Sequence, residues 1–230
     1  MYFTCEPGEC QGNLFKSLFI DFHFLFTIPK YQKILPLTKI LLHGKMSPHK
    51  DSIREGRKMA KNLVVFYSRK GENHMPGGIQ VLPIGHTACA AAFIQKALDA
   101  DIFEIDTVMP YAENYRQCCM EAVEEFKSNA RPEIKGFMED ISGYDTIFVC
   151  FPCWCGTAPM CVFTFLEHYD LTGKKIAPLC TNEGSGLAKA PEDLAKSCPG
   201  AVIAEGLAVF GHQVKDSEVL ITEWAKAHIS

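Results

Sequence analysis

Residues 145–159 read DTIFVCFPCWCGTAP, and the fold can be worked out from this stretch outward. Thr146–Phe151 is a continuous run of apolar and β-prone residues, which predicts a buried strand. The run ends at Pro152, and a short loop with one large aromatic residue, Trp154, follows. Ala158-Pro159 then predicts the start of a helix, because proline is favoured in the first helical turn. A loop at the carboxyl end of a strand is where open α/β sheets bind ligands.

Trp154 has two interpretations at this point. It is either an anchor buried under the loop, because tryptophan buries a large area, or a ring that covers a bound ligand. The loop sequence by itself does not decide between these two interpretations of Trp154.

The same alternation of buried runs and helical periodicity continues after residue 60. Buried runs predict strands at 63–67, 101–105, 146–151, 175–180 and within 201–210. Helical spacing predicts helices at 87–98, 115–129, 160–169, 191–198 and 217–228. The last helix is expected to bury Val219, Leu220, Trp224 and Ala225. This alternation predicts one doubly wound α/β domain, a three-layer sandwich with a mostly parallel sheet.

Charge divides the chain into two parts. The net charge of -4 combines +4 in residues 1–58 with -8 in residues 59–230. An acidic body argues against nucleic acid as the partner. With 47% hydrophobic and 22% charged residues, the composition is that of an ordinary globular domain.

Eleven cysteines raise the question of disulfides or metal. The count is odd and no secretory signal pattern is clear, so reduced thiols and a cytoplasmic location are expected. Cys153-Trp-Cys155 is not a C-x-x-C pair, and no second pair or histidine cluster stands at zinc spacing. No metal site is expected.

Residues 1–58 do not continue the pattern. Leu14–Ile28 is rich in Phe and Leu, but charged residues interrupt it, so it is too short for a membrane span. We hypothesise that translation begins at Met59, or at Met46, and that 1–58 is upstream sequence. The alternative is a weakly ordered extension that touches a membrane. The domain itself is expected at 59–230.

Three loops are predicted to meet at the carboxyl edge of the sheet. The first, 68–86, begins with Ser68 and ends with Gly85-His86-Thr87 at a helix start, which suits a phosphate, although Thr87 would also serve as an ordinary cap. The second is 152–157. The third, Thr181–Gly186, offers glycine N–H groups, or is a simple flexible turn. Together they predict a site for a flat aromatic ligand carrying a phosphate.

These loops resemble the flavodoxin family, in particular the bacterial flavodoxin-like FMN-binding branch. The resemblance lies in VVFYS at 64–68 with GHT at 85–87, PCWCGT at 152–157 and CTNEGSG at 180–186, and it covers residues 60–230. It implies a five-stranded parallel sheet of order 2-1-3-4-5 that binds FMN. It also implies that the carbonyl of Gly156 accepts a hydrogen bond from the reduced ring.

The resemblance further assigns cofactor-binding residues. Those at the phosphate would be Ser68, Gly85, His86 and Thr87. Those along the ring would be Pro152, Cys153, Trp154, Cys155, Gly156 and Thr157. Those at the pyrimidine edge would be Thr181, Glu183, Gly184, Ser185 and Gly186. No catalytic residue is assigned.

The sequence also departs from the family pattern. Residues 72–84 lengthen the phosphate loop, His86 replaces an asparagine, and the third loop lacks an aromatic residue. The first expectation is an electron carrier between a reductase and an acceptor protein. The second is an FMN-dependent NAD(P)H:quinone reductase, because the ring would be open on one face. The third is a binding module without flavin.

Overall fold

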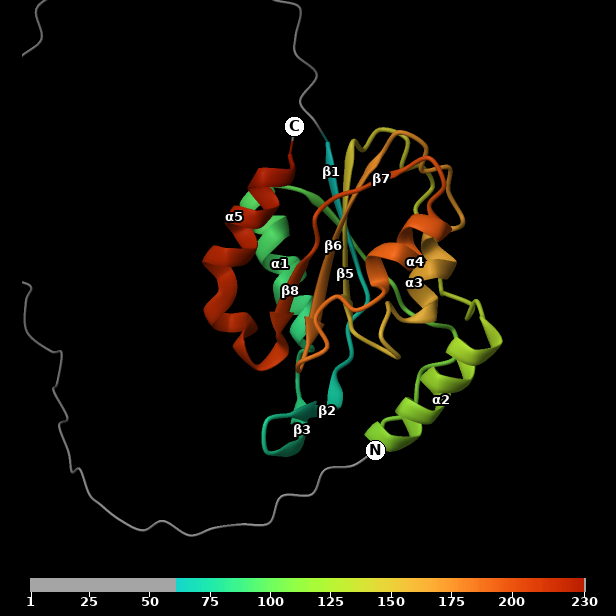
Figure 1. Ribbon diagram of the computed structural model, residues 1–230, viewed down its shortest axis with the longest axis vertical. Coiled ribbons are helices and arrows are strands. Elements are labelled where there is room, and N and C mark those ends of the chain that lie inside the picture. Colours follow the sequence, from blue (N-terminus) through green and yellow to red (C-terminus); the bar gives the residue numbers. More distant parts are fainter. Residues whose placement is uncertain (1–60, 230) are drawn as a thin grey trace, which may run out of the picture. The chain divides into compact units, whose positions relative to one another are not determined.

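The computed structural model describes residues 61–229 (Figure 1). The predicted extension at 1–58 and the proposed starts at Met46 and Met59 lie outside the described residues. No helix among residues 61–229 is long and apolar enough to cross a membrane.

Strands and helices alternate as predicted, with one added hairpin. The strands are β1 (Asn62–Phe66), β2 (Gly71–Met75), β3 (Gly78–Leu82), β4 (Asp101–Glu104), β5 (Thr146–Pro152), β6 (Lys175–Asn182), β7 (Val202–Ile203) and β8 (Leu207–Phe210). The helices are α1 (His86–Leu98), α2 (Tyr115–Ser128), α3 (Met160–Leu166), α4 (Ala190–Ser197), the 3-10 helix η1 (Gly211–Ser217) and α5 (Glu218–His228).

The central sheet is parallel and runs β4-β1-β5-β6-β7, with β8 also paired to β6. Its register aligns Val65 of β1 with Val149 of β5, and Val149 with Pro178 of β6. All these strands therefore deliver their carboxyl ends to one edge. The predicted α/β doubly wound class is confirmed.

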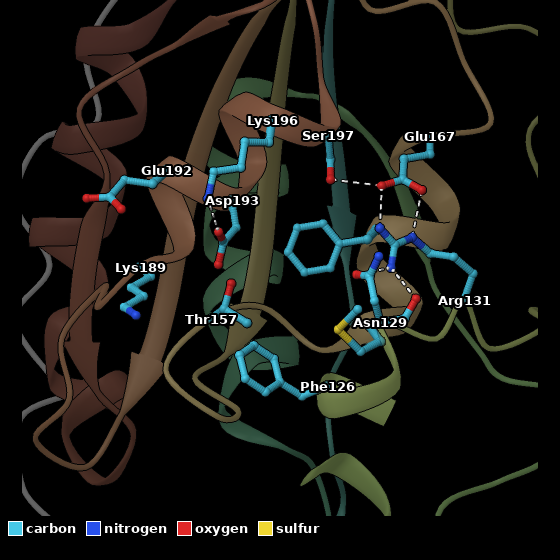
Figure 2. Close-up of a pocket in the computed structure, with 12 residues that line it drawn as sticks. Phe126, Asn129, Arg131, Thr157, Glu167, Lys189, Glu192, Asp193, Lys196 and Ser197 are labelled. Carbon is cyan, nitrogen blue, oxygen red and sulfur yellow. Dashed lines mark hydrogen bonds and ion pairs between the residues drawn. The ribbon is translucent and has the colours of Figure 1, made fainter. Parts of the chain in front are cut away.

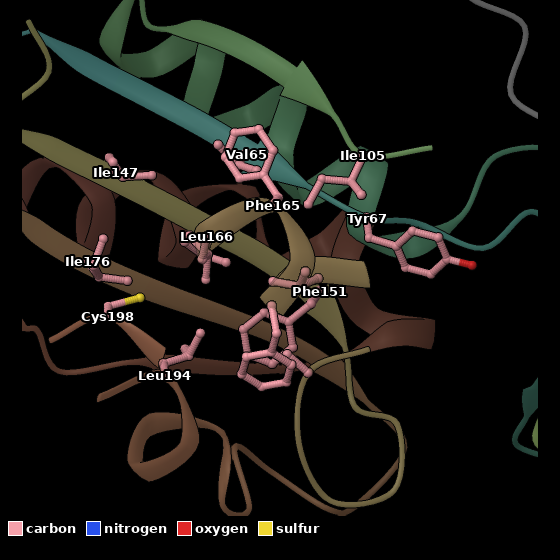
Figure 3. Packing of buried hydrophobic residues seen from close by; sticks show 14 of the residues in the cluster. Val65, Tyr67, Ile105, Ile147, Phe151, Phe165, Leu166, Ile176, Leu194 and Cys198 are labelled. Atoms are coloured by element: carbon pink, nitrogen blue, oxygen red, sulfur yellow. The ribbon is translucent and has the colours of Figure 1, made fainter. Parts of the chain in front are cut away.

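Alternate residues of the strands build two cores, one on each face of the sheet. Val65, Ile147 and Ile176 point to the face covered by α3 and α4, where Phe165 and Leu194 pack against them (Figure 3). The residues between them, including Val64, Phe148 and Ala177, face α1 and α5. Both faces of the sheet are covered, which explains why the strands read as uninterrupted apolar runs.

Three expectations are corrected. Residues 68–86 are not all loop, because β2 and β3 form an antiparallel hairpin that turns at Pro76-Gly77. The predicted fifth strand is two short strands, β7 and β8, so the sheet has six strands rather than five. The break lies near Gly206, where an added Cβ would stand 2.8 Å from a Leu187 methyl carbon. The main chain at Gly206 therefore lies in close contact with the Leu187 side chain.

The buried face of the last helix is the third correction. Val219 and Leu220 are 74% and 54% exposed, whereas Ile221 and Ala225 are fully buried. The reason is that η1 precedes α5 and already buries Val214. A 3-10 helix has three residues per turn, so it shifts the phase with which α5 meets the sheet.

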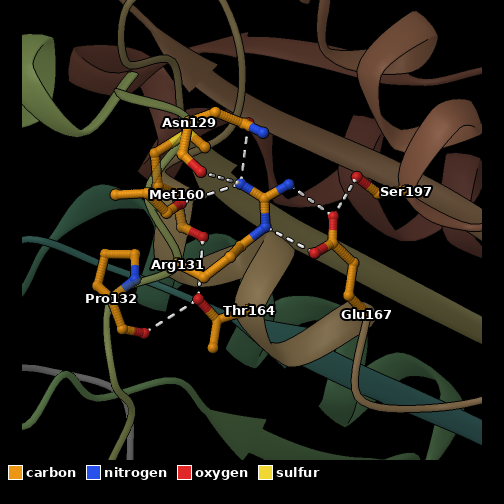
Figure 4. A network of polar contacts seen from close by, with 8 residues as sticks. Asn129, Arg131, Pro132, Met160, Thr164, Glu167 and Ser197 are labelled. Atoms are coloured by element: carbon orange, nitrogen blue, oxygen red, sulfur yellow. Dashed lines mark hydrogen bonds and ion pairs between the residues drawn. The ribbon is translucent and has the colours of Figure 1, made fainter. Parts of the chain in front are cut away.

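A polar network joins the helices on the α3 side (Figure 4). Arg131 Nε and Nη2 donate to Glu167 Oε2 and Oε1 at 2.6 and 2.7 Å, and Ser197 Oγ donates to Glu167 Oε1 at 2.9 Å. This bidentate pair fixes the segment after α2 against α3 and α4. Arg131 accordingly orients the helices that back the second loop.

Candidate functional site

The first loop leaves β1 in close contact with the start of α1. Ser68 Oγ accepts a hydrogen bond from the Ala88 N–H at 3.0 Å. A Cβ added to Gly85 would lie 2.3 Å from both Arg69 O and Ser68 Oγ. Position 85 therefore has to be glycine, because the chain leaving β1 crosses the helix N-terminus at this point. The N–H groups of His86 and Thr87 in the first helical turn have no partner within the helix.

Thr87 connects the first loop to the third. Its hydroxyl lies 2.7 Å from the Thr181 hydroxyl, and the two residues are 2% and 5% exposed. Two loops that are 94 residues apart in the chain are thus joined by one buried hydrogen bond. The predicted convergence of these loops is present in the structure.

His86, Glu183 and His212 form a cluster beside the helix start. Glu183 accepts hydrogen bonds from the His212 main-chain N–H at 3.0 Å and pairs with His212 Nδ1 at 2.5 Å. A Cβ at Gly211 would lie 2.3 Å from His86 Nδ1 and 2.8 Å from Glu183 Oε1. Burial lowers the pKa of His86, with Glu183 opposing this effect. His86 is thus held neutral in the protein alone.

The second loop is a tight two-residue turn. The N–H of Trp154 donates to Thr157 O at 3.0 Å, and the Thr157 N–H donates back to Trp154 O at 2.9 Å. Cys155 and Gly156 between them have φ of 52° and 76°, as a type I′ turn requires. The Gly156 carbonyl accepts from the Lys189 N–H at 2.9 Å. The carbonyl expected to face a flavin is therefore bonded to the start of α4.

Trp154 combines both of its interpretations. Its ring makes edge contacts with Tyr67 and Tyr111, at centroid distances of 5.3 and 4.9 Å. The side chain is only partly buried and also lines the cavity described below. One side of the indole is thus anchored to the core while another remains open to a ligand.

The third loop is closed by Asn182. Its Oδ1 accepts from the N–H groups of Gly184 and Gly186 at 2.8 and 3.1 Å, and its Nδ2 donates to Val209 O. These two glycine N–H groups were expected to face a ligand, but Asn182 satisfies them. Gly184 and Ser185 are exposed.

Cys153 is the unusual thiol of the site. Hydrogen bonds from the Cys180 thiol and then from the Ser185 hydroxyl lower the pKa of Cys153 to about 6, although burial opposes them. The partner thiol responds in the opposite direction, because donation to Cys153 and burial both raise the pKa of Cys180. The lowered pKa favours the thiolate form of Cys153. All nine cysteines in residues 61–229 are free.

A cavity of about 140 Å³, here named cavity A, lies where the three loops meet. Seven predicted site residues line it: His86, Thr87, Pro152, Cys153, Trp154, Thr181 and Glu183. Six further lining residues were not predicted: Arg69, Asn73, His74, Tyr115, Asn182 and Gly211. Several of these come from the hairpin side, which the sequence did not indicate.

The other predicted residues lie around cavity A. Ser68 and Gly85 line an adjoining cavity of about 460 Å³ below the hairpin, and Cys155 lines one of about 280 Å³. Thr157 faces a separate cavity of about 480 Å³ on the α3 side (Figure 2). Gly156, Gly184, Ser185 and Gly186 are not among the lining residues of these cavities. The assignment of these residues to a cofactor stays a prediction.

Arg69 is the most informative residue that the sequence did not point out. It is only 9% exposed, and its Nε and Nη2 donate to Glu72 O and Glu113 O at 2.9 and 2.6 Å. Among residues 61–229 it has no carboxylate partner. Its position directly after a buried strand was the available signal.

Comparison with known proteins identifies the fold and the family. The family model described as Flavodoxin matches residues 82–228. The chain belongs to the flavodoxin family. This flavodoxin-family chain finds no match among curated proteins.

Solved structures agree with the assignment. A protein designated a flavoprotein from Bacteroides uniformis is 26% identical to this flavodoxin-family chain, with a TM-score of 0.60, covering 73% of this chain and 99% of that one. A second, from Bacteroides eggerthii, is 27% identical with a TM-score of 0.53, covering 70% and 98%. A flavoprotein from Lactobacillus acidophilus in complex with FMN shares the fold at 20% identity and a TM-score of 0.52, covering 68% and 97%.

Proposed function

We propose that the protein binds FMN at cavity A and carries electrons between redox proteins. The observation that carries the proposal is the buried Thr87–Thr181 hydrogen bond, which holds the α1 N-terminus and the end of β6 together beside Trp154. In open α/β sheets, ligands bind at this carboxyl edge. Family membership and the flavoprotein relatives support the same ligand.

The residues present fit the phosphate end of such a cofactor. Gly85 lets the main chain reach the start of α1, and the free N–H groups of the first turn suit an anion. His86 stands at this position and gains a positive charge when an anion favours its protonated form. Ser68 is proposed to hold the same group, although its hydroxyl also accepts from the Ala88 N–H.

The residues at the ring end fit a flat aromatic group. Pro152, Cys153 and Trp154 supply one wall, and Thr181 with Glu183 supplies a polar edge. Cavity A holds about 140 Å³, which is below the roughly 300–1,000 Å³ of typical ligand pockets. A bound flavin would therefore extend beyond cavity A and stay partly exposed, as transfer to a partner requires.

The bound flavin would supply the redox chemistry, while the protein sets position and electrostatics. A negative charge on Cys153, which its lowered pKa favours, and the net charge of -8 in residues 59–230 would both disfavour extra negative charge at the ring. The same acidic surface would attract basic faces of partner proteins. Reductase and acceptor proteins are the proposed partners.

The direct test is a titration of the purified protein, stripped of cofactor, with FMN and with riboflavin. We expect saturable quenching of flavin fluorescence at one FMN per chain, with weaker binding of riboflavin, which has no phosphate. A Trp154→Ala variant should change the visible spectrum of the bound flavin. No binding of either flavin would instead favour a binding module that works without flavin.

A second assay separates carrier from enzyme. The FMN-loaded protein is mixed with NADPH and a quinone, with and without a flavodoxin reductase. A carrier needs the added reductase. Turnover without it would favour the NAD(P)H:quinone reductase alternative.

A further inference from the structure

A second cavity adjoins the proposed flavin site. This cavity B has a volume of about 280 Å³ and shares Arg69, Asn73, Tyr115, Cys153 and Trp154 with cavity A. Its remaining wall comes from α2 and from the turn at Cys155. Trp154 and Cys153 thus stand between the two cavities, so a ligand in B would lie beside a flavin in A.

Cavity B is lined mainly by apolar and thiol side chains, with Asn73 and Tyr115 as polar residues and a single charge. Its own wall consists of Cys118, Cys119, Ala122, Val123 and Cys155, which are small apolar or thiol side chains. Thiols pack as small hydrophobic groups. Arg69 is the single charged residue among those that line the cavity, and no carboxylate lines it. The cavity on the α3 side differs, because carboxylates line it and two of its three cations, Arg131 and Lys196, are paired with Glu167 and Asp193 (Figure 2).

Arg69 is a buried cation with no counter-charge among the residues that the structure describes. Its two hydrogen bonds go to main-chain carbonyls and use two of its five N–H donors. Buried charges in proteins are ordinarily paired, because an unpaired one loses its hydration without compensation. Within residues 61–229 no Asp or Glu pairs with Arg69, so the described part of the chain leaves the guanidinium without a counter-charge.

Cavity B also has its own entrance. Cys119 and Cys155 are exposed, and Val123 is 39% exposed. These three side chains come from α2 and the Trp154–Thr157 turn, and none of them lines cavity A. Cavity B is therefore open to solvent at side chains that do not line cavity A.

We propose that cavity B binds a second ligand, a small planar aromatic molecule that carries an oxyanion, with the oxyanion on Arg69 and the rings against Val123, Cys118 and Trp154. This inference rests on the proposed FMN site and goes beyond the proposed carrier role, because it adds a small-molecule ligand beside FMN to the protein partners. It names Arg69 as the residue that selects anionic over neutral aromatic molecules.

The test measures how tightly naphthalene-2-sulfonate binds to the FMN-loaded protein at equilibrium. The neutral probe of similar shape is 2-naphthylmethanol. Fluorescence reports probe binding, and the visible spectrum reports whether FMN stays bound. Arg69→Met should weaken binding of the sulfonate about tenfold or more and of the alcohol less than about threefold. Val123→Trp, which fills the cavity from α2, should remove binding of both, and Val219→Trp on exposed α5 should not.

Three results would overturn the proposal: displacement of FMN by the sulfonate, an equal loss of both probes in Arg69→Met, or unchanged binding in Val123→Trp. The first would place Arg69 in the cofactor site. Circular dichroism and the FMN stoichiometry of each variant show whether it is folded. If Arg69→Met does not fold, the result for Val123→Trp still tests whether cavity B binds the probes. If the protein binds no FMN, the proposed function fails by itself, and the probe titration on the protein as purified still decides whether cavity B is a site.

Discussion

The hydroxyls of Thr87 and Thr181 lie 2.7 Å apart in the interior, one in the first turn of α1 and the other near the end of β6. Both are threonines at positions where a valine would fill nearly the same space. We therefore expect the two hydroxyls to matter for the polar edge of the site more than for the packing of the core. Disruption of the pair should affect the ligand more than the fold.

We expect Thr87→Val and Thr181→Val each to weaken FMN binding about fivefold, the loss of roughly one hydrogen bond. The double variant should lose less than the two single losses combined, because both remove the same interaction. Fluorescence titration measures the affinities. Thr222→Val on α5 serves as the control. Additive losses would mean that the two hydroxyls contact a ligand independently.

Gly85→Ala should destabilise the protein by about 1–3 kcal/mol, the usual cost of overpacking. The new methyl group would stand 2.3 Å from Arg69 O and Ser68 Oγ, so either the helix start or the strand exit has to shift. FMN binding should weaken with it. Gly143→Ala is the matched control, since an added Cβ there meets nothing within 4 Å. Urea unfolding of both variants measures the difference, and equal stability would show that the close approach is absent.

Cys153 should react with iodoacetamide along a pH profile centred near 6, since its pKa is lowered to about 6. The lowered pKa also predicts that stability rises with pH between about 6 and the unfolded value near 9, where only the unfolded state still binds the proton. Below pH 6 this contribution is lost. Mass spectrometry after timed alkylation identifies the site. Cys180→Ala removes the first hydrogen bond and should move the profile to higher pH.

FMN affinity should rise as the pH falls below neutrality. Burial lowers the pKa of His86 in the protein alone, whereas a phosphate beside it would raise that pKa, so binding takes up a proton. Titrations at a series of pH values measure this slope. Riboflavin, without a phosphate, should show little of it, and His86→Gln should remove it. An identical slope for both flavins would place the phosphate away from His86.

Glu167→Gln should lower the free energy of unfolding by about 1 kcal/mol, because the ion pair with Arg131 is partly exposed. The pKa of Glu167 is lowered by the hydrogen bond from Arg131, so this stabilisation is present above about pH 4.5 and lost as the acid is protonated at lower pH. Denaturation at pH 7 and at low pH measures the difference between variant and parent. The difference should shrink at low pH.

The sheet was predictable because both of its faces are covered. Strands β1, β5 and β6 are buried along most of their length, so their apolar runs have no polar interruption. The hairpin escaped prediction because β2 is GENHM, with no alternating apolar pattern and only partial burial. The Pro76-Gly77-Gly78 sequence was its available turn signal.

The sequence was enough to predict which loops form the candidate site, but not all of the hydrogen bonds and the burial within them. Ser, Thr and Trp directly after buried strands indicated the edge, because parallel strands bring their ends together. The sequence could not show that Asn182 would occupy the N–H groups of Gly184 and Gly186. Nor could it show that Arg69 is buried, since a charged residue after a strand is ordinarily solvated. The burial of Arg69 depends on a distant segment, through its hydrogen bond to Glu113 O, whereas the Asn182 bonds are local to the third loop.

The hairpin is tied at its base and free at its tip. Glu72 Oε2 accepts from the Tyr115 N–H at 2.7 Å, and Asn73 Nδ2 donates to Arg69 O, whereas Ile79, opposite His74 near the turn, is exposed. Few contacts oppose local opening of the tip, so its amide hydrogens should exchange with solvent long before those of β1 and β5. The part of the wall that His74 supplies would then close or widen around a ligand, while Arg69 and Asn73 at the base and the sheet beneath stay in place.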